Sequence, residues 1–148
     1  MANEFSASVV VDCPIDTVFA FLADGTNDPK FSPRVQEIQK TTDGPVGVGT
    51  VFESRVKDAG MTTRRKFELT ALDLPTTIRW TERSKNMVTV PHGGYDLEAV
   101  TEAQTKVTIH NVLAGHGFGK LIVGFALRAA VKDGPAFGQR IKSAVEGA

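Results

Sequence analysis

The chain has 148 residues, a length at which one domain can bury a single sizeable core. Seventeen basic residues balance seventeen acidic ones, and 41% of the residues are hydrophobic. No field of one sign therefore favours nucleic acid or an anionic membrane, and we expect no nucleic-acid partner, although a neutral total is compatible with a local patch. The single cysteine, Cys13, excludes an internal disulfide and a cysteine-based zinc cluster, and we expect it to be a small buried thiol.

The first residues contain no basic segment followed by a long apolar run, so we expect no signal peptide and a cytoplasmic location. The most apolar run, 121–131, is far shorter than the ~20 residues of a membrane helix, so we expect no membrane span. The valines before Asp12 predict a first strand. Asp12 is a candidate N-cap for a helix starting near Pro14, and a turn or short second helix then leads through Phe31.

From Val35 the hydrophobic period changes to two, which is typical of strands in an antiparallel sheet with one wet face. Six strands are predicted, with a break at Pro91–Gly94 in the fifth of them. Their sequences are VQEIQKT, TVFESRVK, TRRKFELTALD, TTIRWTERS, MVTVPHGGYDLEAV and TKVTIHNVLA.

A long amphipathic helix is predicted after the last strand. Pro135 lacks an N–H group and clashes with the preceding turn, so we expect a break or kink near Asp133–Pro135 and a final helical segment that ends near Gly147. The order of elements predicts one α+β domain over residues 1–148. In it, a curved antiparallel sheet of about seven strands surrounds the long helix and leaves an internal cavity.

Two glycine-rich stretches resemble phosphate loops but are better interpreted as turns. The stretch DGPVGVGTVF leads into an alternating strand, so no helix N-terminus is present to hold a phosphate. The stretch AGHGFGK has Ala114 and Leu121 where a nucleotide-binding loop needs glycine and serine or threonine. We expect no cofactor.

The whole chain resembles the START-related superfamily (SRPBCC), whose helix-grip fold is shared by the birch pollen allergen and polyketide cyclase/dehydrase-like proteins. The resemblance rests on VVVDCPIDTVFAFLADGTNDPKFSP, GPVGVGTVF, FELTALDLPTTIRW and the long final helix. It implies the fold, but no single activity, because this superfamily includes lipid carriers, ligand-binding proteins, aromatases and cyclases, and chaperone co-activators.

The sequence gives little support for metal or nucleophilic catalysis. The only histidines are His92, His110 and His116, and no two have the spacing that places metal ligands on one helical face. We therefore predict no metal site and expect all three histidines to be exposed. Cys13 is not accompanied by an evident base, and no Gly-x-Ser-x-Gly motif is present.

An inward-facing set of side chains gives the best functional hypothesis. Binding pockets are mostly apolar with a few well-placed polar groups, and strand alternation and the helix stripe predict such a lining. The candidate ligand-binding residues are Phe52, Ser54, Arg65, Phe67, Trp80, Tyr95, Ile109, Asn111, Phe118, Ile122 and Phe125.

Three functions remain open. The first is a carrier or sensor that binds an apolar or aromatic small molecule, such as a lipid, polyketide or isoprenoid. The second is a metal-free cyclase or dehydratase, in which Arg65 or Tyr95 polarises a carbonyl and Glu82 is the best candidate carboxylate for proton transfer. The third is an interaction module that uses the C-terminal helix, and the chain is expected to be a monomer or homodimer.

Overall fold

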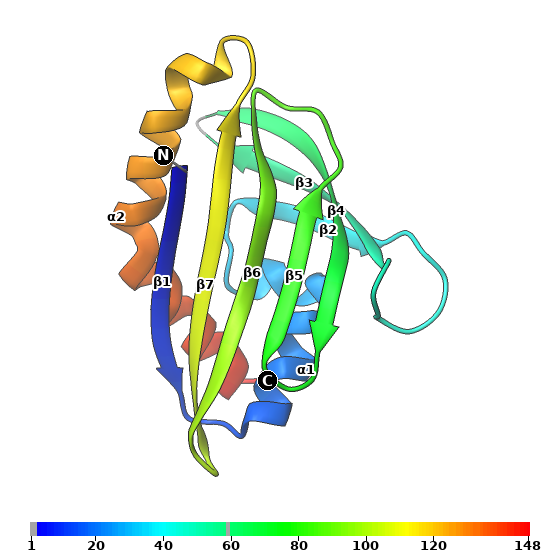
Figure 1. The fold of residues 1–148 in the computed structure, drawn as a ribbon, viewed down its shortest axis with the longest axis vertical. Coiled ribbons are helices and arrows are strands. Elements are labelled where there is room, and N and C mark those ends of the chain that lie inside the picture. Colours follow the sequence, from blue (N-terminus) through cyan, green and yellow to red (C-terminus); the bar gives the residue numbers. More distant parts are fainter. Residues whose placement is uncertain (1–2, 59) are drawn as a thin grey trace.

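The computed structural model describes residues 3–58 and 60–148. Seven strands and a long C-terminal helix make up most of the chain, with an α-helix and a 3-10 helix after the first strand (Figure 1). The elements are β1 (Asn3–Val11), α1 (Ile15–Ala23), η1 (Gly25–Lys30), β2 (Val35–Lys40), β3 (Val51–Asp58), β4 (Met61–Asp73), β5 (Thr77–Glu82), β6 (Val88–Thr101), β7 (Gln104–Gly115) and α2 (Gly119–Glu146).

All seven strands form one antiparallel sheet in the order β1-β7-β6-β5-β4-β3-β2. The strands from β2 to β7 follow one another as a meander, and β1 joins the far edge by pairing with β7. The sheet curls so strongly that β2 and β3 lie behind β5 and β6 in Figure 1. The expected α+β helix-grip fold is confirmed.

The core lies where α1, the last part of α2 and the inner face of the sheet meet. Val11, Val18, Ile78, Val107 and Ile141 are each at most 1% exposed. Burying a side chain of this size stabilises the fold by ~1.5–3 kcal/mol.

Helix α2 packs mainly against β1, beside the sheet edge (Figure 1). Two glycines permit the close approach: a β-carbon at Gly134 would lie 3.3 Å from Cβ of Ala7, and one at Gly138 would lie 3.2 Å from Cβ of Val9. The helix continues through Pro135, so of the two alternatives expected there, a break or a kink, the break is excluded. Helix α2 is 28 residues long, and it contacts β1 on both sides of the proline, at Gly134 and at Gly138, which supports the helix despite the missing N–H group. The helix ends at Glu146 with Gly147 as its C-cap, which agrees with the predicted end near Gly147.

Two smaller expectations are also corrected. Pro14, not Asp12, occupies the N-cap position of α1, and the Asp12 carboxylate instead binds Lys142 of α2 with an O–N distance of 3.0 Å. The break expected at Pro91–Gly94 is wrong, since strand β6 continues through these residues. The pairing of β6 with β7 is irregular between Thr89 and His92, but this irregularity shifts the register without ending the strand. The glycines of the stretch DGPVGVGTVF lie in a turn between β2 and β3, with positive φ angles at Gly44 and Gly49.

Candidate functional site

The inner face of the sheet brings the predicted strand residues together. Residues directly opposite each other in antiparallel strands share a face. The pairings therefore form rows that run across the sheet on one side, which we call the inner face. The rows are Ile38–Ser54–Arg65, Phe52–Phe67–Glu82, Leu69–Trp80–Gly93–Asn111 and Ile78–Tyr95–Ile109.

The eight strand residues proposed to bind ligand all lie in these rows, so their predicted orientation is confirmed. Phe52, Ser54, Tyr95 and Ile109 are buried. The other four, Arg65, Phe67, Trp80 and Asn111, are half-buried and retain some accessible surface. Whether any of the eight contacts a ligand remains a prediction.

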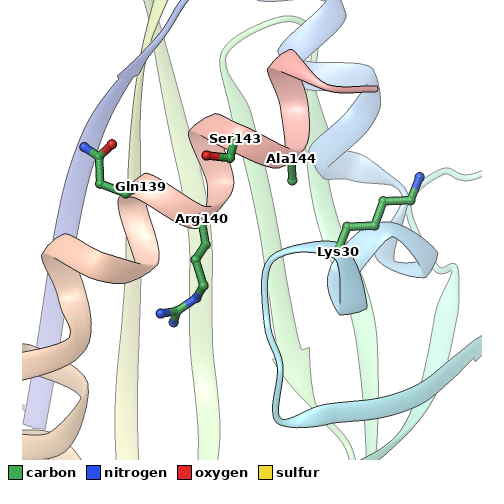
Figure 2. Close-up of a pocket in the computed structure, with 5 residues that line it drawn as sticks. All are labelled: Lys30, Gln139, Arg140, Ser143 and Ala144. Carbon is green, nitrogen blue, oxygen red and sulfur yellow. The ribbon is translucent and has the colours of Figure 1, made fainter.

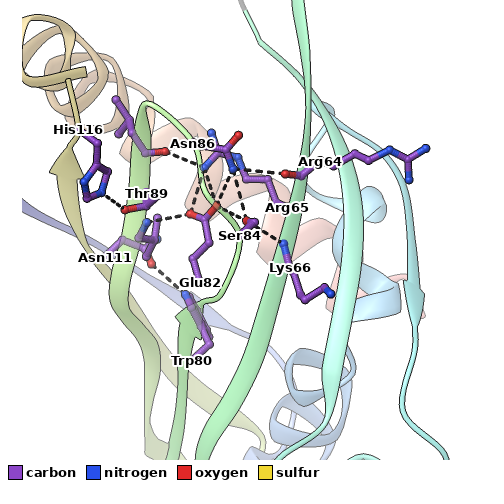
Figure 3. Close-up of polar contacts among 12 residues, drawn as sticks. Arg64, Arg65, Lys66, Trp80, Glu82, Ser84, Asn86, Thr89, Asn111 and His116 are labelled. Atoms are coloured by element: carbon purple, nitrogen blue, oxygen red, sulfur yellow. Dashed lines mark hydrogen bonds and ion pairs between the residues drawn. The ribbon is translucent and has the colours of Figure 1, made fainter. Parts of the chain in front are cut away.

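Glu82 is held in a buried ion pair on this face (Figure 3). Its side chain is 0% exposed, and its Oε1 lies 3.1 Å from Nη1 of Arg65, whose side chain is 22% exposed. The carboxylate also accepts hydrogen bonds from the backbone N–H of Val90 at 2.9 Å, Ser84 Oγ at 2.6 Å and Asn86 Nδ2 at 2.9 Å. Both carboxylate oxygens thus accept hydrogen bonds. This arrangement favours a role for Glu82 in holding Arg65 in place over the role in proton transfer that the sequence suggested.

Trp80 and Asn111 form the next polar pair. Nε1 of Trp80 donates to Oδ1 of Asn111 at 3.1 Å (Figure 3). Both side chains cross the strand between them at Gly93, where a β-carbon would lie 2.0 Å from Oδ1 of Asn111. Glycine at this position is therefore required by the close approach of two side chains.

Tyr95 presents a hydroxyl group to the inner face. Its ring meets that of Trp80 edge-on, with centroids 5.1 Å apart. Burial, and secondarily the negative charge of Asp28, raises the pKa of Tyr95 well above its ordinary value, so the hydroxyl stays protonated at neutral pH. Among the described residues the hydroxyl has no hydrogen-bond partner. Every fully buried side-chain N or O atom of the described residues does have such a partner, so the Tyr95 hydroxyl is not fully buried and retains accessible surface.

Asp28 is a residue that the sequence pattern did not single out. It lies in η1, which packs against β2, and burial together with the nearby charge of Asp24 raises its pKa to about 7. A carboxyl group with this pKa exchanges a proton near neutral pH. The Asp28–Pro29 dipeptide is evident in the sequence as a turn, but its burial depends on the packing of η1 and has no local signal.

A pocket of about 380 Å³ lies at β2, β3 and β4. It is lined mostly by charged and polar side chains, which include Ser54 and Arg65 but neither Trp80 nor Tyr95. A second pocket, of about 370 Å³, lies between η1 and the last part of α2 and is lined by polar and small residues (Figure 2). Arg140 lines that second pocket and donates from Nε to the carbonyl oxygen of Phe31 at 3.0 Å, which ties α2 to η1. The first pocket is the better candidate, because two of the proposed ligand-binding residues, Ser54 and Arg65, line it and none lines the second.

Three of the proposed lining residues do not point inward. Phe118, Ile122 and Phe125 are 80%, 40% and 67% exposed, respectively. The opposite side of the first half of α2, which carries Val123, Leu127 and Ala130, is half-buried instead. The sequence correctly predicts that these apolar side chains share one side of the helix, but the prediction that this side faces the interior is wrong. Helix α2 packs beside β1 and turns this side outward.

The histidines and Cys13 take no part in the inner face. His92 and His116 are exposed as expected, and His116 contacts Thr89 Oγ1 through Nε2 at 2.8 Å. His110 is less exposed than expected, because its Nε2 lies 3.1 Å from Oδ2 of Asp96 on the outer face. Cys13 is a free thiol that is half-buried against the core.

Comparison with known proteins gives the family. The family model described as polyketide cyclase/dehydrase and lipid transport matches residues 2–145. The chain therefore belongs to this family, within the START-related superfamily. No curated protein matches the sequence. Over the described residues, no helix is long and apolar enough to cross a membrane.

Solved structures share the fold at low sequence identity. The protein TTHA0849 from Thermus thermophilus has a TM-score of 0.80 and 14% identity, with 97% of each chain covered. The Zhui aromatase/cyclase from Streptomyces sp. R1128 has a TM-score of 0.75 and 17% identity, with 99% of this chain and 93% of that chain covered. The di-domain ARO/CYC BexL from the BE-7585A biosynthetic pathway has a TM-score of 0.75 and 20% identity over 97% of this chain, which spans 46% of that one.

Proposed function

We propose that this protein binds an apolar or aromatic small molecule on the inner face of its sheet, in the manner of a carrier or sensor. The observation that carries the proposal is the Tyr95 hydroxyl, a permanent donor with no partner among the described residues, set among apolar side chains. The ion pair that fixes Arg65 beside the 380 Å³ pocket adds a second polar anchor. A mostly apolar site with a few convergent polar groups is typical of small-molecule binding.

Trp80 offers a direct test, because it is the chain's only tryptophan and lies on the inner face. Lipids, isoprenoids and aromatic polyketide analogues should change Trp80 fluorescence and displace a bound environment-sensitive dye. Native mass spectrometry should show one ligand per chain. A protein that neither binds the dye nor retains any of these compounds would contradict the proposal.

A cyclase or dehydratase is the second candidate, and Asp28 is the observation that favours it. Its carboxyl group has a pKa of about 7 and influences the Tyr95 hydroxyl electrostatically, so the two groups supply a proton acceptor and a hydrogen-bond donor. The family description and the aromatase/cyclase among the structural neighbours support the same possibility. The enzymatic function would be supported if the protein turns over a poly-β-keto thioester analogue and Asp28→Asn abolishes this turnover. Binding of the analogue without turnover would support the carrier or sensor function instead.

A further inference from the structure

We infer that the first half of α2 docks on the surface of an anionic lipid bilayer, which goes beyond the proposed ligand binding. The inference starts from a contiguous exposed apolar surface. Phe118, Leu121 and Phe125 are 80%, 74% and 67% exposed, and Ile122 is 40% exposed. Spacings of three and four residues place these four side chains on one side of the helix. We call this surface the α2 apolar face.

The loop between β5 and β6 lies against the start of α2. Met87, which is 44% exposed, lies in this loop. Its carbonyl oxygen accepts a hydrogen bond from the backbone N–H of His116 at 2.8 Å, and a β-carbon at Gly119 would lie 1.7 Å from that oxygen. Figure 1 shows the loop and the start of α2 at the same end of the molecule. A scattered exposed hydrophobic residue is ordinary, but a group of this kind marks an interaction site.

The charged side chains of the first half of α2 are all basic. The sequence contains no aspartate or glutamate from 103 to 132, whereas Lys120, Arg128 and Lys132 are all exposed on α2. Arg128 and Lys132 continue the side of the helix that carries Phe125, and the Arg128 guanidinium lies 4.7 Å from the centre of that ring. Exposed aromatic and aliphatic side chains bordered by basic ones are typical of helices that lie in the interface of an anionic membrane.

The same charges favour a bilayer over a second copy of the chain. In a two-fold dimer the same surface meets itself, so Arg128 and Lys132 of both copies would bring four basic side chains into one interface, and the stretch 103–132 supplies no carboxylate to neutralise them. Anionic lipid headgroups neutralise these side chains while the apolar ones enter the acyl boundary. The opposite side of the helix, which carries Val123, Leu127 and Ala130, is half-buried, whereas the apolar face is already exposed, so docking needs no unfolding.

Vesicle flotation tests the inference with the full chain. Binding is expected to vesicles that contain phosphatidylserine in phosphatidylcholine, and it should weaken as salt is added. Phe118→Ser/Phe125→Ser should weaken this binding by about tenfold or more, because two exposed rings lose their burial in the membrane. Arg128→Gln/Lys132→Gln should weaken binding to the anionic vesicles and reduce its salt dependence.

The matched control is Val48→Ser/Leu74→Ser, which removes two apolar side chains that are 66% and 71% exposed elsewhere on the molecule. It should bind vesicles like the wild type. No binding to anionic vesicles, or an equal loss in the control, would overturn the inference. So would a dimer in light scattering that Phe118→Ser/Phe125→Ser dissociates, since the face would then pair with a second copy. Dye displacement without vesicles reports on the proposed ligand binding separately.

Discussion

Trp80 and Asn111 are joined by a hydrogen bond of 3.1 Å that crosses the backbone of Gly93. The contact links β5 to β7 above the strand between them, and it fixes the indole ring that meets Tyr95 edge-on. One glycine thus determines how two residues of the candidate site are oriented.

Gly93→Ala should separate this pair. The new β-carbon would lie 2.0 Å from Oδ1 of Asn111, so the side chains must move, and we expect the free energy of unfolding to fall by ~1–3 kcal/mol. Urea denaturation and Trp80 fluorescence measure the two effects. The control is Gly47→Ala, where no atom lies within 4 Å and φ is not positive, and which should be neutral or slightly stabilising. Equal stability of both variants would show that the contact is not needed.

Glu82→Gln should destabilise the protein. The substitution removes the charge that balances Arg65 and places an amide among groups that donate hydrogen bonds. Because Arg65 is 22% exposed and can still be hydrated, we expect a loss of ~1–3 kcal/mol, less than for a fully buried pair. The urea midpoint should fall while the slope of the transition is unchanged. Glu68→Gln is the matched control, because its pair with Arg83 is exposed and is worth only ~0–1 kcal/mol. A small effect at Glu82 would mean that Arg65 finds another partner or solvent.

Asp28→Asn should stabilise the protein at pH 8 and leave its stability unchanged near pH 4. The folded-state pKa of Asp28 is raised to about 7 from an ordinary value of 3.8, so between these values the folded state binds more protons than the unfolded state. The free energy of unfolding therefore falls as pH rises through this window, because the folded state must ionise a carboxyl group in an unfavourable place. Asparagine does not ionise, so the variant should not show this fall. Thermal unfolding from pH 4 to pH 8 measures the difference, with the exposed Asp43→Asn as a control. A difference that does not depend on pH would contradict the raised pKa.

Tyr95→Phe should separate ligand binding from stability. The hydroxyl has no partner among the described residues, so its removal should change the free energy of unfolding by less than ~0.5 kcal/mol. A ligand that accepts its hydrogen bond should bind about threefold to tenfold more weakly, which corresponds to the loss of one net hydrogen bond of ~0.5–1.5 kcal/mol. Isothermal titration measures the affinity. Thr108→Val, which loses the Ser8–Thr108 hydrogen bond on the outer face, should leave it unchanged.

The period of two in the strands was sufficient to predict the inner face. Ser54, Phe67 and Trp80 alternate with charged or polar neighbours. An antiparallel sheet with one buried face cannot shift its register by one residue without reversing every side chain. Arg65 and Asn111 followed from the same alternation. This part of the site was predictable because it depends on local pattern alone.

The direction of α2 was not predictable in the same way. The stripe with Phe118 and Phe125 looks the same in the sequence whether it packs on a sheet or faces outward. The choice was made by Gly134 and Gly138, which bring the helix against Ala7 and Val9 of β1. Likewise, the ion pair of Glu82 depends on Arg65, which lies 17 residues away in β4, and the surroundings of Asp28 depend on the packing of η1 against β2, and no local pattern records such contacts.

The pairing of β1 with β7 has a consequence for how the protein is made. Asn3 lies opposite Leu113, so the first strand finds its partner only after more than two thirds of the chain has been synthesised. Such distant pairing requires the closure of a long loop before it gains contacts, which slows folding. Until then Val9 and Val11 have no sheet to join, and the newly made chain exposes an unpaired, valine-rich strand that is prone to aggregate.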